Sequence, residues 1–200
     1  MCKIMKEYIF RLDIALMLLG EKKVFYKIIN SNEERENTLD EVRVHQGWFN
    51  LNRCAYISCE CDAKKDDDKV HYIMFSKDNE IFDTFKKWKF NTHQTATFIG
   101  EICEIPECCL NKFIEINYSL VNMEKNILKE IKEQNINNFS IKSKKEGVAH
   151  SPYIFHVPCS NTCKISLERM KINKEKNDTL MKQICKKFNY DYEEVGEKHV

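Results

Sequence analysis

Hydrophobic and polar positions in the first part of the chain alternate between a helical period and a strand period. Apolar residues recur at helical spacing over residues 5–19 and Gly20 follows, so the pattern predicts a core helix that ends there. The apolar residues 24–29 predict a strand. Residues 30–40 are polar and predict a loop or a short exposed helix.

Residues 42–61 predict an extended segment. Within it, residues 53–61 alternate, which places every second side chain on one face of a strand. The charged residues 62–69 predict a hairpin connection, across which a strand at residues 70–75 pairs back on the first. Apolar residues at helical spacing then predict a helix over residues 81–88.

The next predicted helix begins at Asn91 or Thr92 and contains a glycine. Its apolar stripe consists of Phe98, Ile99, Ile102 and Cys103. Gly100 lies within this stripe, where the missing side chain favours a close contact with another helix. Pro106 interrupts the pattern, and the sequence predicts it as the first residue of the following helix.

Further elements follow towards the C-terminus. The pattern predicts a helix over residues 120–134, a polar linker over residues 135–147 and a strand over residues 153–157. Ser160 or Asn161 is then expected to cap a long helical region. These elements indicate an α+β protein with a small, mostly antiparallel sheet and several packed helices.

The chain of 200 residues is long enough for one good core. Both cysteine motifs lie in the second part of the chain, so we expect an N-terminal α/β region at residues 1–90 and a cysteine-motif region at residues 91–200, folded as one compact unit. The 32 basic residues nearly balance the 31 acidic residues, which gives no overall attraction to nucleic acid or to an anionic membrane.

The cellular compartment follows from the cysteines and from the lack of a membrane signal. No apolar run approaches the ~20 residues of a membrane span, and no N-terminal segment resembles a signal peptide. We therefore expect a cytoplasmic protein without a membrane partner. Ten cysteines in a reducing compartment favour metal binding or thiol catalysis over disulfides.

The densest group of chemically competent residues is the segment His156-Val157-Pro158-Cys159-Ser160-Asn161-Thr162-Cys163. If a helix begins near Ser160, then Cys159 and Cys163 lie on about the same side of its first turn. The helix dipole then lowers the pKa of a thiol there and favours the thiolate, the form that binds metals and attacks electrophiles. His156 is a candidate third ligand.

The segment Pro106-Glu107-Cys108-Cys109 repeats this arrangement, since a proline again precedes thiols at a predicted helix start. Neighbouring residues of a helix diverge by ~100°. We therefore expect one of the two cysteines to face a shared site while the other packs in the core.

The leading hypothesis is a zinc or iron–sulfur site made by Cys159, Cys163 and one or both of Cys108 and Cys109, with His156 as a ligand or as a partner of the ligands. An all-thiolate set suits an iron–sulfur cluster, whereas a histidine ligand suits zinc. The hypothesis predicts sulfurs from the two motifs about 3.5–4 Å apart around one metal.

Two alternatives remain open, and buried cysteines also occur without any chemical role. In the first, Cys159 is the nucleophile of a thiol enzyme, with His156 or His150 as its base and Cys163 as a resolving thiol. In the second, basic residues of the C-terminal helices bind RNA or a protein partner. Those residues are Lys164, Arg169, Lys171, Lys174, Lys176, Lys186 and Lys187.

Residues 92–170 resemble an uncharacterised family found mainly in methanogenic and related archaea, domain of unknown function 483. The matching motifs are Thr95-Ala96-Thr97-Phe98-Ile99-Gly100, Ile105-Pro106-Glu107-Cys108-Cys109, and His156-Val157-Pro158-Cys159-Ser160 with Cys163. In that family a glycine and an aromatic residue more often precede the proline, where this chain has Glu104-Ile105. The resemblance implies a cysteine-dependent site shared by the two motifs.

Overall fold

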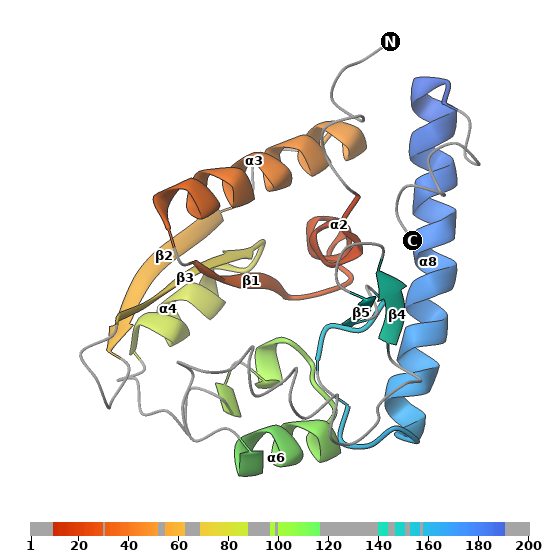
Figure 1. Ribbon diagram of the computed structural model, residues 1–200. Helices are drawn as coiled ribbons and strands as arrows, with labels where there is room; N and C mark the ends of the chain where they lie inside the picture. The colour runs from red at the N-terminus through yellow and green to blue at the C-terminus, as the bar shows by residue number, and fades with distance from the viewer. Residues whose placement is uncertain are drawn as a thin grey trace.

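The computed structural model describes residues 10–29, 31–51, 55–62, 69–87, 97–98, 100–116, 140–143, 147–150, 153–156 and 158–190. The elements, in chain order, are α2 (Leu12–Leu19), β1 (Val24–Ile29), α3 (Asn32–Phe49), β2 (Ala55–Asp62), β3 (Lys69–Ser76), α4 (Asn79–Lys87), α6 (Glu107–Ile116), β4 (Ser140–Ser143), β5 (Gly147–His150) and α8 (Lys164–Phe188). Figure 1 shows α3 and α4 on opposite sides of the larger sheet and α8 along one side of the molecule. The predicted α+β class is confirmed.

The larger sheet has the order β1-β3-β2, and both pairs of neighbouring strands are antiparallel. The predicted hairpin is confirmed, because β3 pairs back on β2 with Tyr56 opposite Phe75. Alternation along β1 and β3 sends Phe25 and Phe75 to one face and Val24 and Met74 to the other, and all four are buried. The sheet therefore needs a helical layer on each face.

Helices α2 and α3 form the layer on the first face. Their buried residues meet those of β1 and β3 in one cluster, made by Ile14, Met17, Leu18, Phe25, Ile29, Leu39, Val42, Ile73 and Phe75. The other side of α2 packs against α8, where Ala15 and Leu16 join Met181 and Ile184. Apart from Asp13, which pairs with Arg11, helix α2 is apolar and largely buried, as predicted for a core helix. Gly20 ends it with a positive φ of 81°.

The second face of the sheet is covered by α4 and by the helical turn that contains Phe98 and Ile102. This turn connects the sheet to α6. A Cβ added at Gly100 would overlap the side chain of Leu110 in α6, so the predicted close contact at this glycine is confirmed.

Gly100→Ala is expected to destabilise the protein by about 2 kcal/mol, because the added methyl group overpacks the contact with Leu110. Chemical unfolding of the variant measures this cost. In a Leu110→Ala background the space is free, so the same substitution should cost much less there. Equal costs in the two backgrounds would contradict the proposed contact.

Several predicted boundaries were wrong in the first half. Residues 42–49 are not extended but continue α3, which Ser31 caps by accepting a hydrogen bond from the Glu34 N–H. Buried residues at helical spacing, among them Leu39 and Val42, then attach this helix to the sheet. The helix predicted at residues 5–19 is interrupted at Phe10 and Arg11, so α2 begins at Leu12; residues 1–9 lie outside the described residues.

The second half also differs from the prediction in two places. The expected linker at residues 135–147 contains β4, which pairs with β5 as a hairpin. No strand forms at residues 153–156. The strand in this part of the chain is β5, which lies earlier, at Gly147–His150, and pairs with β4. The helix expected at residues 120–134 lies outside the described residues.

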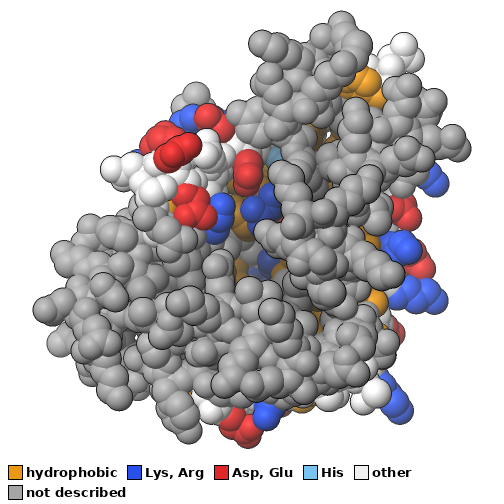
Figure 2. Space-filling view, viewed as in Figure 1, with side chains coloured by type: hydrophobic (Ala, Val, Ile, Leu, Met, Phe, Trp, Pro, Cys, Tyr) orange, Lys and Arg blue, Asp and Glu red, His pale blue; other side chains and the backbone are white. Residues whose placement is uncertain are grey.

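The described part of the visible surface is mixed in charge. Figure 2 shows Lys, Arg, Asp and Glu side chains interspersed along the edge of the molecule where α8 runs. Of the described helices, none is long and apolar enough to cross a membrane.

Candidate metal centre

Helix α6 presents two cysteines in its first turn. The Pro106 carbonyl accepts hydrogen bonds from the N–H groups of Cys109, at 2.8 Å, and Leu110, at 2.9 Å. The sequence predicted Pro106 as the first residue of the helix. In the structure it stands one residue before the helix, which begins at Glu107. Cys108 and Cys109 follow at the positive end of the helix dipole.

The turn before α6 has an uncommon backbone at Glu104. Its φ of 56° lies in the left-handed region that favours glycine. Here the N–H of Ile105 donates to the Gly100 carbonyl at 2.8 Å, which ends the preceding helix as a glycine usually would. This backbone explains why a glycine suits the position, although this chain has Glu104 there. The Arg169 guanidinium of α8 donates to the Glu104 carbonyl.

The second motif forms a loop rather than the start of a helix. Helix α8 begins at Lys164, with Cys163 as its N-cap residue. Ser160 therefore does not cap the helix; its carbonyl accepts the Cys163 N–H at 3.2 Å within a turn. The prediction that Cys159 lies in the first helical turn is wrong, and only Cys163 stands at the helix terminus.

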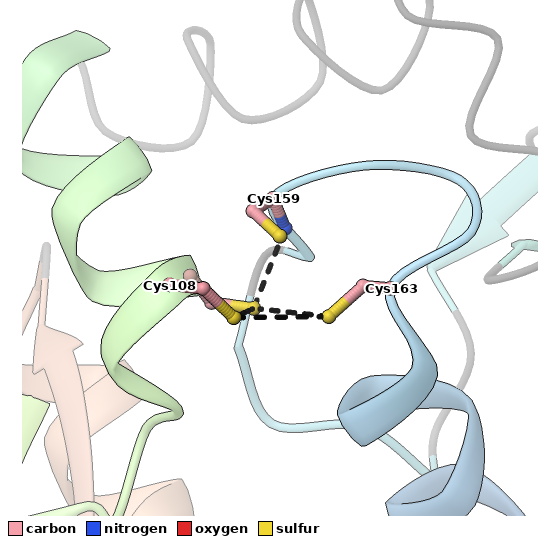
Figure 3. Close-up of side chains that lie close together, drawn as sticks. Cys108, Cys159 and Cys163 are labelled. Atoms are coloured by element: carbon pink, nitrogen blue, oxygen red, sulfur yellow. Dashed lines mark hydrogen bonds between the residues drawn. The ribbon is translucent and has the colours of Figure 1, made fainter.

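The two motifs bring four thiols to one point. The Sγ atoms of Cys108, Cys109, Cys159 and Cys163 all lie within 4.8 Å of one another. Cys163 Sγ is 4.0 Å from Cys108 Sγ and 3.7 Å from Cys109 Sγ, and the last two atoms are 3.9 Å apart. Figure 3 shows the side chains of Cys108, Cys159 and Cys163 pointing towards each other from α6, the loop and the start of α8. The predicted convergence is confirmed, but the expectation that only one cysteine of α6 faces the site is wrong.

The pKa of Cys163 is lowered, whereas the pKa values of Cys109 and Cys159 are raised. Burial opposes ionisation of Cys163, but the hydroxyl and backbone N–H of Ser166 and the thiols of Cys159 and Cys109 lower its pKa to about 7. Burial raises the pKa of Cys109 to about 12. The pKa of Cys159 is also raised, first by burial and then by its thiol neighbours, so the predicted lowering at Cys159 is wrong.

Ser166 lies between the cysteines and His156. It is fully buried, and its Oγ lies 3.2 Å from Cys163 Sγ, 3.4 Å from Cys109 Sγ and 2.9 Å from His156 Nε2. The group of potential metal ligands found among the described residues contains the four cysteines and not His156. The sequence analysis missed Ser166, although its position three residues after Cys163 places it on the same side of the first helical turn.

The four thiols fit a single tetrahedral metal ion. A tetrahedron with metal–sulfur bonds near 2.3 Å has sulfurs about 3.8 Å apart. The Sγ separations among Cys108, Cys109 and Cys163, from 3.7 to 4.0 Å, match this edge, and Cys159 Sγ lies within 4.8 Å of all three. Four thiolates are also a donor set that selects zinc or iron.

The fold and the site together define an α+β protein in which four thiols from two distant segments converge on one point. A family model for proteins of unknown function (DUF483) matches residues 56–188, so the chain belongs to this family. The match extends the resemblance on both sides of residues 92–170. No curated protein and no solved structure matches the chain.

Proposed function

We propose that the protein binds one metal ion, with zinc preferred, through Cys108, Cys109, Cys159 and Cys163. The single observation that supports this most strongly is the set of Sγ separations at the edge length of a metal–thiolate tetrahedron. The ion would join α6 to the start of α8, so its role is structural.

The surroundings favour the negative charge of four thiolates. Both α6 and α8 begin at the cluster, and the positive ends of their dipoles face it. The Cys159 N–H donates to Cys109 Sγ at 3.4 Å, and the Ser166 hydroxyl donates to Cys163 Sγ. Donors of this kind around the ligands orient them and tune the metal.

Zinc fits better than an iron–sulfur cluster because the sulfurs are close together. A cluster inserts several iron and sulfide atoms between the thiolates and requires them to stand farther apart than a single ion does. All four Sγ atoms lie within 4.8 Å, which suits a single ion. We assign His156 the role of a partner rather than a ligand, because it reaches the site through Ser166.

The two alternatives have less support. The thiol-enzyme hypothesis rested on a lowered pKa of Cys159 at a helix terminus, and the structure has neither feature. For RNA binding through α8, three of the basic side chains already contact the protein: Arg169 binds the Glu104 carbonyl, Lys176 binds Glu21, and Lys187 binds the Trp48 carbonyl.

We also propose that residues 1–90 and 91–200 fold as one unit and that the protein works in the cytoplasm. Core clusters that join Met74 to Phe98 and Leu16 to Met181 support the first proposal. The six cysteines whose side chains the structure describes form no disulfide, which suits a reducing compartment.

Anaerobic purification followed by metal and sulfide analysis tests the proposed site. We expect about one zinc ion per chain and no inorganic sulfide. Cys109→Ser and Cys163→Ser should each lose the metal, whereas Cys185→Ser, whose buried side chain lies near the other end of α8, should keep it. Sulfide with a visible absorption spectrum would establish a cluster instead. Wild-type protein that neither carries metal nor takes up zinc would refute the proposal.

A further inference from the structure

The four thiols differ in their access to solvent. Cys109 and Cys163 are buried, Cys159 is half-buried, and Cys108 is exposed. A molecule that approaches the site from solvent therefore meets the sulfur of Cys108 first. A metal held by these ligands would be shielded on the side of Cys109 and Cys163.

The four thiols also differ in their hydrogen-bond donors. Cys109 Sγ accepts from the Cys159 N–H, and Cys163 Sγ accepts from the Ser166 hydroxyl. In the described part of the chain, the hydrogen-bond partners of Cys108 Sγ are the sulfurs of other cysteines. Once those sulfurs bind a metal they carry no proton to donate. The partners of Cys159 Sγ are likewise cysteine sulfurs. Hydrogen bonds withdraw charge from a metal-bound sulfur, so Cys108 and Cys159 would retain more electron density than Cys109 and Cys163. Of these two, Cys108 is the more exposed.

We infer that Cys108 is the nucleophilic ligand of the metal-loaded site and the position at which soft carbon electrophiles alkylate it. This inference rests on the proposed function and adds a substrate class to it. The Cys108 sulfur attacks the carbon of an alkyl donor, the sulfur–carbon bond forms, and the leaving group departs with its electron pair. The product is a neutral thioether, while Cys109, Cys159 and Cys163 keep the metal as thiolates.

Limited alkylation of zinc-loaded protein with iodoacetamide tests the inference. Peptide mass spectrometry follows each cysteine, and a chromophoric chelator follows zinc. We expect Cys108 to react at least about tenfold faster than the other three ligands, with iodide as the leaving group and without loss of zinc. The rate should not fall when free zinc is added in excess, since the metal-bound sulfur itself reacts.

The matched variant is Cys108→Asp, which keeps a zinc ligand but removes the thiol. It should hold zinc and lack the fast reaction, and Cys103→Ser should behave as wild type. Equal rates at the four ligands, zinc release with the first alkylation, or suppression by excess zinc would each overturn the inference and leave the metal site intact. Failure of the wild type to bind zinc would overturn the proposed function, and the inference with it.

Discussion

Zinc is expected to raise the unfolding temperature of the metal-free protein by roughly 8–16 °C. Binding to the native state alone stabilises it by about 4 kcal/mol when free zinc exceeds its dissociation constant about a thousandfold. For a chain of 200 residues, each kcal/mol shifts the midpoint by about 2–4 °C. Calorimetry of reduced protein in zinc-buffered solutions measures the shift, which should follow the logarithm of the free zinc concentration.

The control for this prediction is the zinc-dependent shift in variants, not their absolute stability. Cys109→Ser removes a ligand, so its midpoint should no longer respond to zinc. Cys185→Ser changes a buried core residue and lowers stability by itself, but its response to zinc should equal that of the wild type. A zinc response that is the same in all three proteins would show binding elsewhere.

The stabilisation has a local origin that hydrogen exchange can locate. The metal would connect Cys109 and Cys163, which are 54 residues apart in the sequence. Opening of either helix start would then break metal–sulfur bonds as well as backbone hydrogen bonds. Zinc should therefore slow exchange most in the first turn of α6 and at the start of α8, with a smaller effect in β1 and β3.

The candidate site was largely predictable because its signals are local. A proline next to cysteines marked both segments, and the charge preference of helix termini explained why thiols occur there. Cys108 and Cys163 are 55 residues apart in the sequence. Their convergence depends on tertiary packing, which no local sequence pattern specifies. The sequence left open whether one or both of Cys108 and Cys109 face the site, because that depends on the short loop before α8, which brings Cys163 close to both of them.

The errors in the fold have a common physical cause. Ser160 and Asn161 have high N-cap propensity, but the chain uses them in a turn that orients Cys159 and Cys163. Residues 42–49 contain β-branched and aromatic residues, yet their buried side chains match the helical period of α3. In both places tertiary contacts outweighed a local propensity of a few tenths of a kcal/mol per residue.

His45 is expected to make the protein less stable as the pH falls from about 6.5 to about 4. Its imidazole is fully buried next to the rings of Phe10 and Trp48. Nε2 accepts the Arg11 N–H at 2.8 Å, and Nδ1 donates to the Glu41 carbonyl at 2.7 Å. These two bonds require the neutral ring with its proton on Nδ1, because a protonated ring has no acceptor for the Arg11 N–H.

Burial lowers the pKa of His45 from 6.5 to about 4, against the opposing effects of the Glu41 carbonyl and Asp13. Between these two values the unfolded chain binds a proton that the native protein does not, so stability is full above pH 6.5 and is lost as the pH falls towards 4. The difference in pKa corresponds to about 3 kcal/mol. Urea unfolding at pH 4.0–7.5 should show this loss in the wild type.

His45→Gln separates this effect from the titration of carboxylates, because its amide can both donate and accept but does not ionise. The variant should be less stable at pH 7.5, where the wild-type bonds are intact. It should also lose roughly 3 kcal/mol less than the wild type as the pH falls to 4. Parallel stability curves for the two proteins across this range would mean that His45 is protonated in the native state and that Arg11 has another acceptor.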